Sequence, residues 1–206
     1  MAKIGTDISH AAELLSAGKL VGIPTDTVYG LAGHALKTES LEEIFRVKRR
    51  PQDKPLIAQV DHLDKAIGYV KNIPNYARIL AEKYWPGALT LIFEATDEVS
   101  PVMLSNGNTM GLRVPNHEMA LELLSQLDFP LAVTSANING MPSPTTAGEV
   151  EEQLGDQIEY ILDGGQSQHG LESTIVAFEN KKPKILRAGA ISEAEILATL
   201  NLNLTP

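Results

Sequence analysis

The spacing of apolar positions changes repeatedly along the chain. Apolar residues three and four apart are typical of helices with one buried face, whereas short continuous or alternating apolar runs are typical of strands. The helical pattern occurs in Ile8–Ala17, Ser40–Arg49, His62–Tyr69, Tyr76–Tyr84, Glu118–Leu127, Ala147–Leu154 and Glu193–Leu200. The strand pattern occurs in Leu20–Pro24, Leu56–Val60, Ala88–Glu94, Met110–Val114, Leu131–Thr134, Ile158–Leu162, Thr174–Phe178 and Lys184–Arg187. The two patterns interleave, which predicts an α/β fold.

The order of these elements predicts an open or mixed sheet, because the later strands follow one another without helices between them. Residues Thr96–Asn108 and Gly164–Gly170 have neither pattern, and we expect them to form mobile loops. The chain has no internal repeat, low-complexity tract or long linker. We therefore expect a single domain over residues 1–206.

Composition narrows the possible functions. Twenty-six acidic residues against 17 basic ones give a net charge of −9, which argues against a dedicated nucleic-acid binder with a broad basic face. The absence of cysteine excludes disulfides and thiolate metal sites. The N-terminal segment is polar and lacks the apolar core of a secretory signal, and no apolar run approaches the ~20 residues of a membrane span. We expect a soluble, cytoplasmic globular protein.

Several familiar catalytic motifs do not occur in the sequence. It has no G-x-x-x-x-G-K-[ST] phosphate loop, no G-x-S-x-G nucleophile turn and no G-x-G-x-x-G. The five histidines are scattered and never form H-E-x-x-H, so we predict no metal site built from protein side chains. Candidate chemistry therefore rests on small polar and basic residues at the ends of elements.

The most unusual segment is Arg46–Lys54 (RVKRRPQDK), which holds five basic residues in an acidic chain. Pro51 biases Arg50 toward extended backbone. If the helix ends near Lys48, then Lys48 and Arg50 lie on extended backbone and point the same way. Two cations on one side favour an anion between them. Alternatively, basic residues in a last helical turn only offset the helix dipole, which is worth about 0.3–1 kcal/mol each.

Other polar residues also stand at the ends of apolar runs. Ser135 and Asn137 follow a predicted strand with the same spacing of two, at the strand end where α/β proteins commonly bind ligands; an ordinary turn is the alternative. Arg113 and Arg187 are charges inside strand-like runs. A buried arginine normally has an anionic partner, which is either a ligand or a protein carboxylate in a salt bridge. The sequence leaves both readings open.

Together, these segments resemble one family, the YrdC-type threonylcarbamoyl-AMP synthases, which act in making the threonylcarbamoyladenosine of tRNA. The similarity extends from about Leu20 to Gly189 and follows the family's order: PTDTVYGL, K-x-R-P with K-P-L-I, WPGALTLIF, GLRVP, SANINGMPSPT, STIV and LRAG. The ordered set is specific, above all K-x-R with S-x-N. The resemblance implies a twisted mixed α/β sheet with flanking helices around a concave cavity, as in dihydroxybutanone-phosphate synthase.

The resemblance also implies an enzyme that makes L-threonylcarbamoyl-AMP and pyrophosphate from L-threonine, bicarbonate and ATP, with Mg²⁺ and no organic cofactor. The positive cluster would hold the triphosphate, and a carbamate on the threonine amine would attack the α-phosphorus. The implied catalytic residues are Lys48, Arg50, Ser135 and Asn137. The implied ATP-binding residues are Arg50, Lys54, Thr109, Ser135, Ser143 and Arg187. The implied threonine-binding residues are Thr27, Gln59, Arg113, Val133 (through its backbone) and Ser173.

The sequence departs from a common family pattern at two positions, Lys54 and Gln59, where many members have Asn and His. Longer members carry a second C-terminal domain, and we expect none here because Ser192–Pro206 leaves no room for it. The implied partners are the transferase proteins that complete the tRNA modification, with possible transient contact to tRNA and none to a membrane.

Two alternative functions stay open. The first is a non-catalytic RNA-binding protein, which the net acidity and the five Tyr, four Phe and one Trp argue against. The second is an inactive paralogue of the same fold. Such paralogues typically lack the K-x-R pair, which is intact in this chain.

Overall fold

The structure is a computed structural model that describes residues 1–179 and 182–201; residues 180–181 and 202–206 of the predicted domain lie outside the described part. Its helices are α1 (Ile8–Ser16), α2 (Thr38–Lys48), the 3₁₀ helix η1 (Leu63–Tyr69), α3 (Asn75–Tyr84), α4 (Glu118–Ser125), α5 (Ala147–Leu154) and α6 (Glu193–Thr199). Its strands are β1 (Lys3–Gly5), β2 (Val21–Ile23), β3 (Gly30–His34), β4 (Ile57–Gln59), β5 (Leu89–Glu94), β6 (Thr109–Arg113), β7 (Leu131–Ser135), β8 (Tyr160–Leu162), β9 (Thr174–Glu179) and β10 (Lys182–Arg187).

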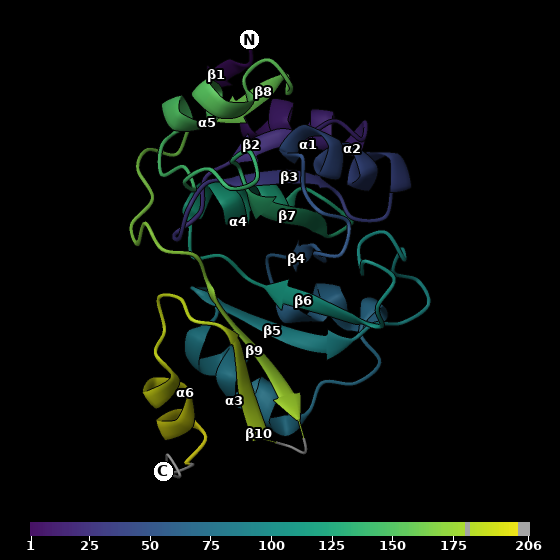
Figure 1. The fold of residues 1–206 in the computed structure, drawn as a ribbon, viewed down its shortest axis with the longest axis vertical. Helices are drawn as coiled ribbons and strands as arrows, with labels where there is room; N and C mark the ends of the chain where they lie inside the picture. Colours follow the sequence, from purple (N-terminus) through teal and green to yellow (C-terminus); the bar gives the residue numbers. More distant parts are fainter. Residues whose placement is uncertain (180–181, 202–206) are drawn as a thin grey trace.

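The strands form one sheet in the order β1-β8-β2-β3-β7-β4-β6-β5-β9-β10. Parallel pairs such as β4 with β6 stand beside antiparallel pairs such as β3 with β7, so the predicted mixed α/β sheet is confirmed. Figure 1 shows the sheet running along the long axis of the molecule, with β1 and β8 at one end and β10 and α6 at the other.

Each predicted helix and strand occurs within two residues of its expected bounds, although His62–Tyr69 forms a 3₁₀ helix. Two strands, β1 and β3, were not predicted from the sequence. The β3 sequence, GLAGH, gave no strand signal because it has two glycines and no β-branched residue. Packing explains this choice, since a Cβ at Gly33 would lie only 2.6 Å from the Ser40 hydroxyl of α2. Gly33 thus lets the helix approach the sheet closely.

The two segments expected to be loops contain no helix or strand among the described residues. The first, residues 96–108, folds back onto the protein and buries Val99, Met103 and Leu104 in the core. Its apolar side chains therefore anchor it, and the mobility of both loops stays a prediction.

Helices cover the two faces of the sheet unequally. On one face, α2, α3, α5 and α6 bury apolar side chains such as Ile44 and Leu80 in a large core. On the other face, α1 and α4 pack over the half of the sheet nearest β1, where Leu15 and Leu124 meet Val21 of β2. The remainder of that second face, over β4, β6, β5 and β9, lines a cavity instead. The uneven helix cover thus positions the candidate site.

None of the helices in residues 1–179 and 182–201 combines the length and apolar character needed to cross a membrane.

Candidate active site

The cavity has a volume of about 610 Å³, and neighbouring strands form its floor. Ile57 of β4 pairs with Val133 of β7 on one side and with Gly111 of β6 on the other. Two residues further along the same strands, Gln59 of β4 pairs with Arg113 of β6. Residues two apart on a strand point to the same face, so this register brings Gln59 and Arg113 to the floor beside the apolar row. A Cβ at Gly111 would lie 3.1 Å from the Thr90 methyl, so the absence of a side chain at Gly111 leaves space for a ligand above this part of the sheet.

The turn after α2 aims the K-x-R pair into the cavity. The helix ends at Lys48, one residue before the predicted end, but the extended geometry expected beyond it is wrong because Arg49 adopts the left-handed conformation, with φ 52° and ψ 40°. The Arg49 amide donates to the Arg46 carbonyl at 3.2 Å, and the Arg50 amide donates to the Phe45 carbonyl at 2.9 Å. This pair of bonds is a Schellman motif. A helix cap, rather than extended backbone, lets both Lys48 and Arg50 line the cavity.

Lys48 is almost fully buried, and its ammonium group binds the segment that carries the S-x-N motif. Its Nζ donates to the Ser135 carbonyl, to the Asn137 carbonyl at 2.6 Å and to Asn137 Oδ1 at 3.1 Å. Ser135 Oγ in turn donates to Asn137 Oδ1 at 2.6 Å. Burial, and then the nearby Arg50 guanidinium, lowers the pKa of Lys48 to about 7, while the Glu172 carboxylate acts in the opposite direction. The four predicted catalytic residues therefore lie together.

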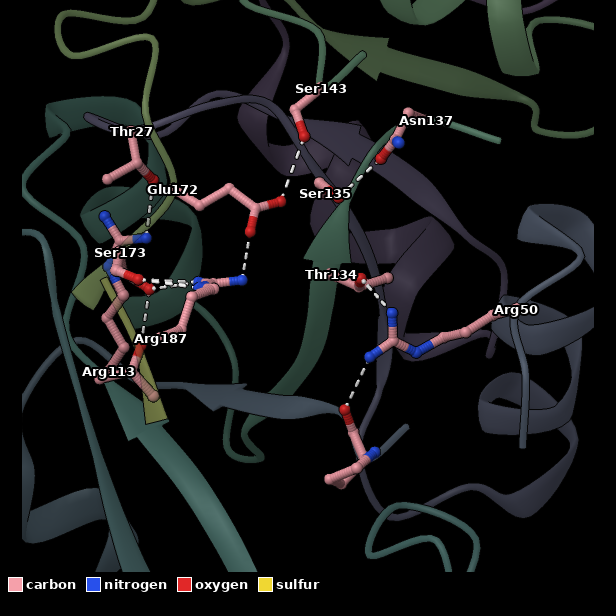
Figure 2. Close-up of polar contacts among 12 residues, drawn as sticks. Thr27, Arg50, Arg113, Thr134, Ser135, Asn137, Ser143, Glu172, Ser173 and Arg187 are labelled. Atoms are coloured by element: carbon pink, nitrogen blue, oxygen red, sulfur yellow. Dashed lines mark hydrogen bonds and ion pairs between the residues drawn. The ribbon is translucent and has the colours of Figure 1, made fainter. Parts of the chain in front are cut away.

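Arg50 lies on one side of the end of β7, across the strand from Arg113 and Arg187, as Figure 2 shows. Its guanidinium donates to the Lys54 carbonyl at 3.1 Å, to the Pro55 carbonyl at 2.9 Å and to Thr134 Oγ1 at 3.3 Å. These bonds use Nε and one hydrogen on each terminal nitrogen. One N–H on each terminal nitrogen is therefore left for a ligand, as far as the described residues show.

Arg113 is 4% exposed and forms a buried ion pair with Asp26, which is 1% exposed. Its Nη2 lies 2.6 Å from Asp26 Oδ1, its Nη1 donates to Thr27 Oγ1 at 2.7 Å and its Nε donates to the Gly87 carbonyl at 2.9 Å. Burial lowers the pKa of Arg113 and Asp26 opposes that shift. The Asn116 amide also donates to Asp26 Oδ1, at 2.9 Å, which fixes the carboxylate that orients Arg113.

Arg187 has a carboxylate partner of its own, Glu172. Nη1 of Arg187 donates to Glu172 Oε2, while Nε and Nη2 donate to the Ser173 carbonyl at 3.1 and 2.9 Å. Nη2 also donates to Ser173 Oγ at 3.0 Å, and that hydroxyl lies 2.8 Å from Thr90 Oγ1. Ser143 Oγ donates to the second oxygen of Glu172 at 3.1 Å. Both apolar-strand arginines thus have protein carboxylates as partners, the salt-bridge alternative that the sequence left open.

The structure brings most of the predicted site residues together. Those that line the cavity are Thr27, Lys48, Arg50, Lys54, Gln59, Arg113, Val133, Ser135, Asn137, Ser173 and Arg187. Ser143 is not part of the lining, although it contacts the lining residue Glu172. Thr109 is also outside the lining; it is exposed at the start of β6, opposite Glu94. A second hollow of about 480 Å³ between α2 and α5 contains none of the predicted residues.

Two acidic residues of the site were not predicted from the sequence. Asp26 and Glu172 immediately precede Thr27 and Ser173, two residues assigned to threonine. The sequence offered one signal, because an arginine in an apolar strand normally has an anionic partner. That signal did not distinguish Asp26 and Glu172 from the other acidic residues of the chain, several of which also stand beside hydroxyl residues.

Gln59 also lies on the cavity floor, and it has an unused hydrogen-bond acceptor. It is 4% exposed, and its Oε1 is buried without a hydrogen-bond partner among the described residues. A buried amide oxygen is costly when it has no donor. It is therefore available to a ligand that carries an O–H or N–H group.

The fold and the site define an α/β protein whose open sheet face gathers lysine, arginines and hydroxyls around one cavity. Comparison with known proteins gives the family. The model of the Sua5, YciO and YrdC proteins, described as "Telomere recombination", matches residues 13–189. The chain belongs to the Sua5/YciO/YrdC family.

Its relatives include enzymes and a solved complex. The chain is 41% identical over 189 residues to a threonylcarbamoyl-AMP synthase of Pyrococcus abyssi, covering 92% of this chain and 56% of that protein. It is 38% identical over 194 residues to the threonylcarbamoyl-AMP synthase of Bacillus subtilis, covering 94% and 56%. The structure of P. abyssi Sua5 complexed with L-threonine superposes with a TM-score of 0.93, at 37% identity over 97% of this chain and 61% of that one. The chain thus spans little more than half the length of these relatives.

Proposed function

We propose that this chain catalyses the ATP-dependent synthesis of L-threonylcarbamoyl-AMP from L-threonine, bicarbonate and ATP, releasing pyrophosphate. The relatives named threonylcarbamoyl-AMP synthase support the reaction, and the threonine complex of P. abyssi Sua5 supports the amino acid. The observation that carries the proposal is the cavity itself. It has a Lys48–Arg50 group at one side and an Arg113–Thr27–Ser173 group at the other, on one face of one sheet.

The chemistry requires two anions to approach each other. The threonine amine takes up carbon from bicarbonate with loss of water and becomes a carbamate. A carbamate oxygen then bonds to the α-phosphorus of ATP, and the bond to pyrophosphate breaks. Because both reactants are negative, the catalyst mainly has to position them and neutralise charge. Lys48, Arg50 and Arg187 are suited to that work, since all three are cationic side chains that line the cavity.

Threonine fits the other side of the cavity. Arg113 uses three of its five N–H donors on Gly87, Thr27 and Asp26, which leaves one on Nη1 and one on Nη2 for a carboxylate. The unpartnered Gln59 Oε1, in register with Arg113, is suited to accept from the threonine hydroxyl or ammonium. Thr27, Ser173 and the Val133 strand would complete this pocket.

ATP and Mg²⁺ are part of the same proposal. Arg50, Lys54, Ser135 and Arg187 line the cavity and would contact the phosphates, with Thr109 and Ser143 as the more distant candidates. Among residues 1–179 and 182–201, no cluster of three or more His, Asp or Glu side chains is suited to hold a metal. The cavity carboxylates are Asp53 and Glu172, which fits Mg²⁺ carried on phosphate oxygens with at most one or two protein ligands. Bound Mg²⁺ would neutralise phosphate charge.

In the cell, the adenylate would pass to the transferase proteins that complete threonylcarbamoyladenosine in tRNA. The names of the relatives support a transferase in tRNA modification. We place this reaction in the cytoplasm, where tRNA, ATP and bicarbonate occur together. Any contact of the chain with tRNA itself would be transient.

The experiment is pyrophosphate release by the purified chain with ATP, L-threonine, bicarbonate and Mg²⁺. We expect release that requires both threonine and bicarbonate and that stops when bicarbonate is rigorously removed. Release that ignores bicarbonate would identify a simple amino-acid adenylating enzyme and overturn the proposal. No release under any condition, from a folded chain that binds threonine, would favour an inactive member of the family.

A further inference from the structure

Glu172 lines the cationic part of the cavity and contacts two residues that the proposed function assigns to ATP. One carboxylate oxygen accepts from Arg187 Nη1 and the other accepts from Ser143 Oγ at 3.1 Å. Figure 2 shows the Glu172 side chain between Ser143 and the Arg187 guanidinium. The carboxylate therefore uses the groups that a phosphate would need.

The donors of Arg187 make this competition specific. Nε binds the Ser173 carbonyl, and the two hydrogens of Nη2 bind the carbonyl and the hydroxyl of Ser173. Of the five N–H donors of a guanidinium, these bonds leave only the two on Nη1, and Glu172 holds one of them. An anion can take both Nη1 donors only if it replaces Glu172.

The field of Glu172 also reaches the other cations of the cavity. Its carboxylate acts to raise the pKa of Lys48, Arg50 and Arg187 alike, against the effect of burial. Lys48 spends its three N–H donors on the Ser135–Asn137 segment, so it attracts an anion mainly by charge. Glu172 partly cancels that charge as long as it lies among these cations.

We propose that Glu172 is a built-in counter-ion that competes with the anionic substrate for Arg187 and Ser143. Polyphosphate binds by displacing the carboxylate from Arg187, so part of its attraction to the cavity is offset by the lost ion pair. Anions of weak affinity do not displace it, and the carboxylate can return to Arg187 when pyrophosphate leaves. The Glu172–Arg187 contact is half-buried, with each side chain 35% exposed, so both partners have room to move. The proposal rests on the proposed function only in taking polyphosphate as the anion.

The test measures binding of inorganic tripolyphosphate, without Mg²⁺, by calorimetry. Glu172→Gln keeps the shape of the side chain and removes its charge, and we expect it to tighten tripolyphosphate binding by about five- to tenfold. The matched control is Glu179→Gln, which breaks the exposed Glu179–Lys184 ion pair on the adjoining β9–β10 hairpin. That variant should change the affinity by less than about twofold.

A double-mutant cycle locates the competition. In an Arg187→Ala background, the gain from Glu172→Gln should shrink to less than about twofold, because the contested group is gone and only the field of Glu172 on Lys48 and Arg50 remains. Weaker binding by Glu172→Gln would instead make Glu172 a residue that orients Arg187, and would overturn the proposal. So would a gain of undiminished size without Arg187, which would mean that Glu172 acts only through its field, or a failure of every variant to bind tripolyphosphate. Pyrophosphate release with threonine and bicarbonate tests the reaction separately, so the two proposals can fail independently.

Discussion

At the scale of single residues, the site is a set of paired charges. Asp26 holds Arg113, Glu172 holds Arg187, and the carbonyl groups of Ser135 and Asn137 hold Lys48. Buried charges need such partners, because an isolated ion loses its hydration without compensation. The two arginines therefore depend on carboxylate partners that no motif match identified, whereas Lys48 depends on the S-x-N segment itself.

The Asp26–Arg113 pair gives the first prediction. Asp26→Asn leaves the guanidinium buried without a counter-ion, and breaking such a pair costs about 3 kcal/mol or more of unfolding free energy. Urea denaturation at pH 7 measures this loss as a lower midpoint at unchanged slope. Glu94→Gln is the control, since it breaks the exposed pair of Glu94 with Lys71 and should change little. If the two variants are equally stable, the buried pair contributes no more than a surface one.

Lys48 gives a prediction for pH. With its pKa lowered to about 7, Lys48 is an ammonium below pH 7 and loses its charge above it. Its contribution to anion binding should therefore be largest below pH 7 and fall as the pH rises, with a midpoint shifted upward because a bound anion stabilises the ammonium. Calorimetric titrations of tripolyphosphate at pH 6 to 9 measure this.

The comparison with Lys48→Met isolates that contribution from the titration of the phosphate itself. The ratio of wild-type to variant affinity should fall with pH as Lys48 is deprotonated. A ratio that stays constant from pH 6 to 9 would mean that the three oxygen acceptors keep Lys48 charged throughout this range.

At the scale of elements, the end of α2 decides where the K-x-R pair points. The Schellman turn holds Arg49 at a positive φ. Residues with a Cβ are strained in this conformation, whereas glycine is not. Arg49→Gly should therefore stabilise the protein by about 0.5–1 kcal/mol, whereas Arg49→Ala, which keeps the Cβ, should not. Glu42→Gly, at an exposed interior position of the same helix, should destabilise by about 1 kcal/mol. Equal effects of glycine at positions 42 and 49, measured by denaturation, would contradict the left-handed cap.

The elements also show what the sequence could and could not predict. Helices and strands with clear periodicity, such as α1 and β5, were predicted within two residues. β3 was not, because its glycines allow close packing, of Gly33 against α2 and of Gly30 against Val133 of β7, rather than raise strand propensity. The extended geometry expected for Lys48 and Arg50 was wrong because the hydrogen bonds that cap the helix place Arg49, between them, in the left-handed conformation.

Sheet order and charge pairing lay beyond local patterns. β9 lies beside β5 although they are some 80 residues apart in the chain, and this neighbour relation brings Ser173 to Thr90. Such contacts depend on the whole chain, so motifs nominated candidate residues while the partners Asp26 and Glu172 became visible only in the fold. The resemblance to a family predicted which residues belong to the site, and the structure showed which charged groups pair with them.

At the scale of the whole molecule, a cationic cavity sits in a protein of net charge −9. The short-range charge of Lys48, Arg50 and Arg187 can hold a compact anion, because the ligand lies within a few ångströms of them. A large polyanion such as tRNA also meets the rest of the surface, where acidic residues outnumber basic ones. Attraction inside the cavity and repulsion outside it should therefore separate small phosphates from nucleic acid.

This separation gives the last prediction, which also decides between a synthase and an RNA-binding protein. Labelled tRNA, followed by fluorescence anisotropy, should bind no tighter than about 10⁻⁴ M at 150 mM salt, the weak end of non-specific affinity. Tripolyphosphate should still bind under the same conditions. The control is competition: any tRNA signal at 50 mM salt should be displaced by tripolyphosphate if it arises in the cavity and persist if it arises elsewhere. Submicromolar tRNA binding that falls steeply between 50 and 200 mM salt and resists tripolyphosphate would reveal a basic face outside the cavity. The RNA-binding function would then be preferred, because a synthase that hands its adenylate to other proteins has no need of such a face.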